Sequence, residues 1–208
     1  MWCHPWFVTQ ITRDRFSPQN TQNVPIEMER IIIDMDEVIA DTMGAMVDWY
    51  KREFGKEVSY EKMLGGPWSN GFPEEDRHLI RQRLLSPGFF RDLPVMEGSV
   101  EVLEEMNKRY ELFIVSAAVE FPNSLKDKLE WLLEHFPFFS WKQLVLCGDK
   151  RMIHGDHMID DHERNLVHFP GKKYLYTSAH NLHISRYRRL NNWKEVAAHF
   201  LSNNNRGG

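Results

Sequence analysis

Short apolar runs alternate with helix-type patterns along much of this chain of 208 residues. The first run, Arg30–Asp34, contains three consecutive isoleucines, which is typical of a strand buried on both faces of a parallel sheet. Similar runs recur at residues 111–115, 143–147, 157–160 and 173–177. Because strands that alternate with helices form βαβ units, the sequence predicts an α/β fold with a Rossmann-like parallel sheet.

The alternation stops between residues 43 and 94, where no strand-like run occurs. A helical pattern over residues 38–54 ends at Gly55, and acidic residues after Pro73 favour the start of another helix. We therefore expect a small helical cap at residues 43–94, inserted after the first strand. The core would then comprise residues 28–42 and 95–201.

The two ends of the chain differ from this pattern. Residues 19–25 are polar and lack a hydrophobic period, so we expect residues 1–27 to be a disordered extension. Met28 comes just before the first strand and is a candidate for the true initiator. Residues 202–208 are expected to form a loose tail.

Composition argues against several classes of function. The formal net charge is −4 and the pI is about 6.2, so no overall positive field favours nucleic acid or an anionic membrane. No apolar run reaches the roughly 20 residues needed to cross a bilayer. Two cysteines cannot build a disulfide framework, which favours a reducing, cytoplasmic setting. The residues leave the oligomeric state open, including a homodimer.

Pairs of carboxylates stand at the ends of two predicted strands. Asp34 and Asp36 belong to the first run and the turn after it, and Asp160-Asp161 ends the run that begins at residue 157. Ligands bind beyond the carboxyl ends of strands in parallel α/β sheets, so both pairs are candidates for one site. Oxygen ligands alone suit Mg²⁺, which also binds substrate phosphate. An acidic helix start and a solvated turn are the alternative explanations.

Two further residues could bind phosphate at the same edge of the sheet. Ser116 follows the run at 111–115 and offers a hydroxyl and loop N–H groups, while Lys150 follows the run at 143–147 and offers a positive charge. Each residue alone is more often part of an ordinary surface, so the prediction depends on the set. Histidines 154, 157, 162 and 168 straddle a strand and loops without matching cysteines, which disfavours a zinc or iron site.

In this order, the motifs resemble those of the haloacid dehalogenase-type phosphatases. The chain is more similar still to the 5'(3')-deoxyribonucleotidases, whose DMDGVLAD corresponds to DMDEVIAD at residues 34–41. The stretches LFIVSAA, CGDKRMIHGDHMIDD and YLYTSAHN are also similar to segments of that family. The resemblance covers about residues 29–200.

The resemblance implies a Mg²⁺-dependent phosphomonoesterase that hydrolyses (deoxy)ribonucleoside monophosphates to nucleoside and phosphate. Asp34 would be the nucleophile that forms an aspartyl-phosphate, and Asp36 would be the general acid and base. The Mg²⁺ ligands would be Asp34, the Asp36 carbonyl, Asp160 and Asp161. The phosphate ligands would be Ser116, Lys128 and Lys150. The helical cap would close over the nucleoside.

Three positions depart from the family pattern. Ala117 replaces a common hydroxyl residue, which removes one side-chain phosphate donor. Glu37 stands where the family usually has glycine, and glutamate is awkward there if the backbone needs a positive φ. Leu84 aligns with a tryptophan that lines the base pocket in animal relatives. Base stacking is therefore expected from other cap aromatics, the candidates being Trp68, Phe72, Phe89 and Phe90.

Two alternatives to a nucleotidase follow from the same residues. A phosphatase acting on a sugar phosphate or another small phosphate ester would keep the same catalytic set and differ in the cap. The second alternative is a non-catalytic descendant that binds a nucleotide or a protein. Such a protein would be free to lose the motif carboxylates, but all of them are present in this sequence.

Overall fold

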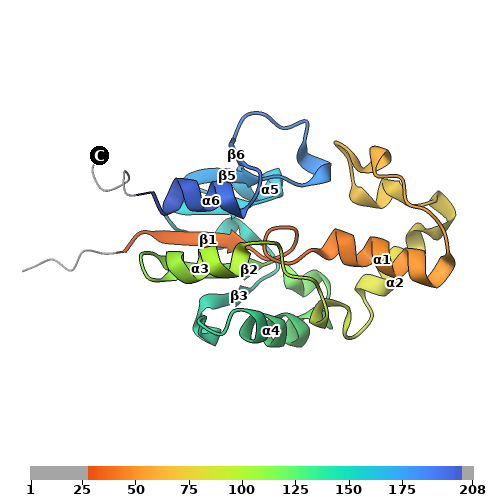
Figure 1. Cartoon of the computed structure of the whole chain (residues 1–208), viewed down its shortest axis with the longest axis horizontal. Coiled ribbons are helices and arrows are strands. Elements are labelled where there is room, and N and C mark those ends of the chain that lie inside the picture. The colour runs from red at the N-terminus through yellow and green to blue at the C-terminus, as the bar shows by residue number, and fades with distance from the viewer. Residues whose placement is uncertain (1–27, 203–208) are drawn as a thin grey trace, which may run out of the picture.

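The computed structural model describes residues 28–202, and its centre is a six-stranded sheet with every neighbouring pair parallel (Figure 1). The strands lie in the order β3-β2-β1-β4-β5-β6. Their bounds are β1 Arg30–Asp34, β2 Glu111–Ser116, β3 Leu144–Leu146, β4 His157–Asp160, β5 Lys172–Tyr176 and β6 Arg188–Leu190. The prediction of an α/β fold with a parallel sheet is confirmed, and the five predicted runs form β1 to β5. The short edge strand β6 was not predicted.

Helices cover both faces of the sheet. Ile31 and Ile33 of β1 pack in one apolar core with α3 (Ser99–Asn107), α4 (Ser124–His135) and α6 (Trp193–Phe200). Ile32 points to the other face and belongs to a separate core with α5 (Glu163–Leu166). Side chains of a strand alternate between its two faces, so three consecutive isoleucines serve both cores.

The helical cap lies between β1 and β2 in the sequence and beyond the carboxyl end of β1 in space (Figure 1). Its helices are α1 (Thr42–Phe54) and α2 (Arg77–Leu84), with the 3₁₀ helices η1 (Glu61–Met63), η2 (Trp68–Gly71), η3 (Glu74–Asp76) and η4 (Phe89–Arg91). The prediction that the first helix begins at residue 38 is wrong. Residues 36–40 form a tight turn instead, and the side chain of Asp41 caps α1 by accepting a hydrogen bond from Gly44 N.

The two segments that join the cap to the core run side by side. Asp41 N donates to Pro94 O at 2.9 Å, and Met96 N donates to Ile39 O at 2.9 Å. Ala40 and Val95 form an antiparallel bridge between these bonds. The cap is therefore connected through a narrow two-stranded junction close to the carboxyl end of β1.

Four more 3₁₀ helices lie in the core, which are η5 (Ala118–Glu120), η6 (Trp141–Gln143, between α4 and β3), η7 (Lys150–Met152) and η8 (Ala179–Asn181). Of these, η5, η7 and η8 follow β2, β3 and β5 and approach the region between the sheet and the cap. Within residues 28–202, no helix is long and apolar enough to cross a membrane. The predicted extension 1–27 and all but the first residue of the predicted tail lie outside the described residues.

Candidate active site

Three carboxylates meet at the carboxyl edge of the sheet. Strands β1 and β4 are parallel neighbours with Ile33 paired to Ile159, so Asp34 and Asp160 end the two strands next to each other. With Asp161, they are 6, 0 and 1% exposed, and a carboxylate oxygen from each lies within 4.8 Å of the others. Like charges this close raise one another's pKa unless a cation lies nearby.

Lys150 places a positive charge beside two of these carboxylates. Its Nζ lies 2.6 Å from Asp34 Oδ1 and 2.8 Å from Asp160 Oδ2. Burial alone would lower the pKa of Lys150, but the charges of Asp160 and Asp34 raise it above its usual value. Burial and the charge of Asp160 raise the pKa of Asp34 to about 6, whereas Lys150 acts to lower it. Asp34 is therefore largely ionised above neutral pH.

Asp160 and Asp161 differ sharply in their surroundings. Asp160 accepts hydrogen bonds from Lys150 Nζ, His162 N and Asn165 Nδ2 at 2.8 to 3.0 Å. Both carboxylate oxygens of Asp161 are buried and have no hydrogen-bond partner among the described residues. Burial raises the pKa of Asp161 well above its usual value, and the charge of Asp34 adds to the effect. An oxygen-only donor set with unpartnered carboxylate oxygens fits a hard divalent cation such as Mg²⁺.

Asp36 is paired with a different lysine. Lys128 Nζ lies 2.5 and 2.6 Å from the two carboxylate oxygens of Asp36, although Lys128 comes from α4, across the site. Thr42 Oγ1 and Ser116 Oγ donate to the same carboxylate at 3.2 and 3.3 Å. Burial alone would raise the pKa of Asp36, but Lys128 outweighs it and lowers the pKa.

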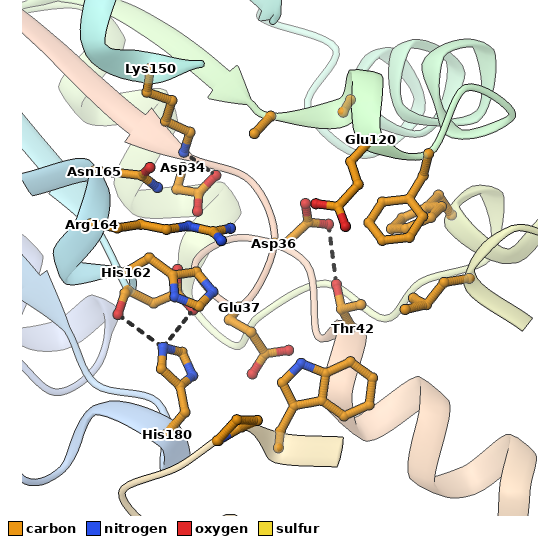
Figure 2. Close-up of a pocket in the computed structure, with 18 of the residues that line it drawn as sticks. Asp34, Asp36, Glu37, Thr42, Glu120, Lys150, His162, Arg164, Asn165 and His180 are labelled. Atoms are coloured by element: carbon orange, nitrogen blue, oxygen red, sulfur yellow. Dashed lines mark hydrogen bonds and ion pairs between the residues drawn. The ribbon is translucent and has the colours of Figure 1, made fainter. Parts of the chain in front are cut away.

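A cavity of about 580 Å³ opens between these carboxylates and the cap. Figure 2 shows Asp34, Asp36 and Glu37 around it, with Arg164 pointing between them from the side of α5. The apolar part of the wall comes from Trp68, Leu84, Phe90 and Phe121. A charged floor and an apolar wall suit a ligand with one anionic and one apolar end.

The predicted base-stacking residues divide into two groups. Trp68 and Phe90 line the cavity. Phe72 and Phe89 are 2 and 3% exposed and are packed in the interior, Phe72 with its ring centroid 5.0 Å from that of Tyr50. The cavity-lining residues Glu120, Phe121 and Arg164 were not predicted from the sequence, because they lie in loops or short helices whose direction depends on the whole fold.

Glu37 occupies an unusual backbone conformation. Its φ is 60°, the one positive value among non-glycine residues in the described part of the chain. The carboxylate accepts hydrogen bonds from Met43 N at 2.6 Å and from Ser178 Oγ at 3.4 Å. Burial raises the pKa of Glu37 to about 7. The sequence therefore identified a position that does adopt the conformation usually reserved for glycine.

Two histidines meet beside Asp161, and sequence spacing did not predict this pair. His162 follows β4, His180 lies in η8, and their rings stack with centroids 4.3 Å apart. His180 Nε2 lies 3.1 Å from the Asp161 carbonyl oxygen and 3.5 Å from Asp161 Oδ2. A ring nitrogen of each histidine and an oxygen of Asp161 lie within 4.8 Å of one another, but the ring planes are only 24° apart, and stacked rings aim their in-plane lone pairs in roughly the same direction rather than at one ion. This orientation argues against a shared transition-metal site.

The comparisons with known proteins agree with this geometry. The family model described as "5' nucleotidase, deoxy (Pyrimidine), cytosolic type C protein" matches residues 28–204. A Staphylococcus epidermidis relative is 40% identical over 174 residues, which are 84% of this chain and 97% of that protein. A Bacillus subtilis relative, named 5'(3')-deoxyribonucleotidase, is 39% identical over 178 residues and covers 84% of this chain and 100% of its own.

Solved structures support the fold. A haloacid dehalogenase-type hydrolase from Bacillus subtilis, determined with bound magnesium, superposes with a TM-score of 0.54 at 13% identity. The match covers 85% of this chain and 100% of that one. In this chain the cap helices lie between β1 and β2. Together with the family match, these similarities show that the chain belongs to the cytosolic type C 5'-nucleotidase family, the 5'(3')-deoxyribonucleotidases of the haloacid dehalogenase-like hydrolases.

Proposed function

We propose that this nucleotidase is a Mg²⁺-dependent phosphomonoesterase that converts (deoxy)ribonucleoside monophosphates to nucleoside and phosphate through an aspartyl-phosphate at Asp34. The observation that carries the proposal is the separation of two carboxylate–lysine pairs on the floor of one cavity. Asp34 pairs with Lys150 and Asp36 pairs with Lys128. Each acid therefore lies on the floor of the same cavity with its own lysine, so one carboxylate can attack phosphorus while the other handles the proton.

The first half-reaction follows from this arrangement. Asp34 attacks phosphorus, the bond from phosphorus to the leaving 5' oxygen breaks, and Asp36 gives its proton to that oxygen. In the second half-reaction, Asp36 takes a proton from water, the water oxygen bonds to phosphorus, and the bond to Asp34 breaks. Asp34 is then regenerated, Asp36 has regained its proton, and inorganic phosphate is released, so that atoms and charges balance over the cycle.

Asp36 must carry a proton before it can protonate the leaving group. In the free protein, Lys128 keeps Asp36 ionised. A phosphate group beside Lys128 would compete for that ammonium group, and Asp36 would lose its counter-ion. Burial would then raise the pKa of Asp36, which favours the protonated form at the moment when it is needed.

Of the four predicted ligands, we assign Mg²⁺ to Asp34, Asp161 and the backbone carbonyl of Asp36. Asp160 belongs to the same carboxylate cluster, but its oxygens already accept hydrogen bonds from Lys150, His162 N and Asn165. Asp160 would contribute by fixing Lys150, to which it is hydrogen-bonded. When bound, the cation supplies positive charge that stabilises the transferring phosphoryl group. Ser116, Lys128 and Lys150 would bind the phosphoryl oxygens.

The nucleoside would occupy the apolar part of the cavity. Trp68 and Phe90 come from the cap, while Phe121 comes from the loop after η5. Flat aromatic side chains that line a cavity can hold the plane of a base, and stacking contributes about 1–3 kcal/mol per base.

The proposal can be tested with the wild-type protein and a substrate panel. Turnover of nucleoside monophosphates, sugar phosphates and a small aryl phosphate would be measured with and without Mg²⁺. We expect Mg²⁺-dependent hydrolysis with nucleotides as the preferred substrates. Preference for a sugar phosphate would favour the alternative phosphatase, and no turnover of any substrate would favour a non-catalytic binding protein.

A further inference from the structure

The strained backbone at Glu37 calls for a compensating interaction. Residues other than glycine avoid the left-handed region because Cβ approaches the following carbonyl oxygen. Glu37 adopts it nevertheless, directly beside the predicted acid Asp36. Such outliers persist only where the surroundings hold them in place, and they often mark functional sites. The side chain, which is 8% exposed, shows what holds it.

The Glu37 carboxylate connects the cap to the core. One oxygen accepts the Met43 N–H in the first turn of the cap helix α1, at 2.6 Å. The other accepts from Ser178 Oγ, at 3.4 Å, in the loop after β5. Residues 37 and 178 are far apart in the sequence, so this bridge exists only in the folded protein.

Residues 178–181, which we call the β5 loop segment, contact both the cap and the predicted metal site. The cap residue Gly65 donates its N–H to Ala179 O at 3.0 Å. Asn181 Nδ2 donates to the Asp161 carbonyl oxygen at 2.8 Å, and His180 Nε2 lies 3.1 Å from the same oxygen. The segment that receives the cap therefore also fixes the backbone of Asp161.

We infer that Glu37 is a positioning residue that holds the cap in its observed position beside the catalytic carboxylates, by linking the start of α1 to the β5 loop segment. Glycine would suit the backbone at this position better but could make neither hydrogen bond. Because the cap supplies the wall of the nucleoside cavity, the inference rests on the proposed function for its effect on substrate binding. Its effect on the cap itself does not depend on the reaction.

Two substitutions distinguish the effect of losing the two hydrogen bonds from the effect of relieving the strained backbone at residue 37. Glu37→Gly relieves the positive φ and removes both hydrogen bonds. Glu37→Gln keeps the shape, since the amide oxygen can still accept from Met43 N and the amide nitrogen can donate to Ser178 Oγ. Glu61→Gln is the matched control, because Glu61 is an exposed glutamate of the same cap.

The first measurement is amide hydrogen exchange in peptides that cover residues 42–49 and 60–68. Loss of the bridge should let the cap open locally, so exchange in both peptides should become at least about tenfold faster in Glu37→Gly. Glu37→Gln and Glu61→Gln should stay within about threefold of wild type. Unchanged exchange in Glu37→Gly would overturn the inference.

The second measurement is steady-state kinetics on a nucleoside monophosphate and on a small aryl phosphate. Glu37→Gly should raise the KM for the nucleotide at least about tenfold, and Glu37→Gln should restore it, because only the larger substrate needs the cap wall. The kcat on the aryl phosphate should change by less than about threefold. Equal losses on both substrates, not restored by glutamine, would mean that Glu37 has a general structural role.

A third variant keeps the inference testable if Glu37→Gly does not fold. If Glu37→Gly gives no folded protein, Ser178→Ala removes only the core half of the bridge and should shift exchange and KM in the same direction by a smaller factor. A Ser178→Ala protein identical to wild type in both measurements would overturn the inference. Failure of the wild type to hydrolyse nucleotides would refute the proposed function, and the exchange experiment would still decide the role of Glu37.

Discussion

The substitution Asp161→Asn exchanges a buried carboxyl group for a neutral amide of the same shape. Both oxygens of Asp161 lack hydrogen-bond partners among the residues that the structure describes, and the side chain is 1% exposed. In the absence of a cation, the folded state must keep this group protonated or bury an unpaired charge. We therefore expect Asp161→Asn to make the metal-free protein more stable.

The size of the effect follows from the cost of protonation. At pH 7, keeping a carboxyl of ordinary pKa 3.8 protonated costs about 4 kcal/mol, at 1.36 kcal/mol per pH unit. This value is a ceiling, since the amide must find its own hydrogen bonds. A gain of about 1–4 kcal/mol in the free energy of unfolding is expected at pH 7, and no more than about 2 kcal/mol at pH 5.

The sign of the pH dependence distinguishes this cause from better packing. The pKa of Asp161 is raised in the folded state, so the folded protein binds more protons than the unfolded chain above pH 3.8. The stability of the wild type therefore falls relative to the variant as pH rises from 3.8 towards the folded pKa. A packing effect would give the same difference at every pH.

Urea unfolding with EDTA at pH 5 and pH 7 measures these differences, and a second series with saturating Mg²⁺ measures the response to the cation. Mg²⁺ should stabilise the wild type by RT ln(1 + [Mg²⁺]/Kd), whereas the variant should respond far less. Activity should be lost in the variant. A variant that is less stable than the wild type in EDTA at pH 7 would refute the reasoning.

Three further predictions concern the reaction. Asp34→Asn should lose several orders of magnitude in kcat while circular dichroism shows an intact fold, because the carboxamide is a poor nucleophile; near-normal activity would exclude the mechanism. Activity should disappear with EDTA and return with Mg²⁺ but not preferentially with Zn²⁺, since the donor set is all oxygen; full activity after exhaustive chelation would contradict this. Trp68→Ala should reduce nucleotide turnover roughly tenfold and spare a small aryl phosphate. Phe72→Ala, by contrast, should destabilise the fold by about 3–5 kcal/mol because Phe72 is interior.

The sequence predicted the parts of the site that depend on strand ends. Asp34 and Asp160 follow apolar runs, and a parallel sheet brings the ends of neighbouring strands to one edge. Local pattern and general topology were enough to predict this convergence. The placement of Lys150 beside both acids follows the same rule, because it comes directly after the loop that leaves β3.

Contacts between elements that are distant in the sequence were not predictable in the same way. Lys128 lies on a helix whose apolar stripe is readable, but its pairing with Asp36 depends on how α4 packs against the sheet. The stacking of His162 with His180 depends on two loops after different strands. Periodicity shows which face of a helix is buried and carries no information about which loop it will meet.

The charges of the site's aspartates and lysines also bear on whether the substrate can bind before the cation. Four aspartates and two lysines leave a formal charge of −2 when every carboxylate is ionised (four negative against two positive). A phosphate monoester would then approach a site of its own sign, which opposes binding. In the proposed mechanism, a divalent cation would bring the balance to zero beside Asp161, whose carboxylate oxygens are buried and have no hydrogen-bond partner among the described residues. If the proposed function holds, the buried Asp161 carboxylate that should destabilise the metal-free protein would also make substrate binding depend on the cation.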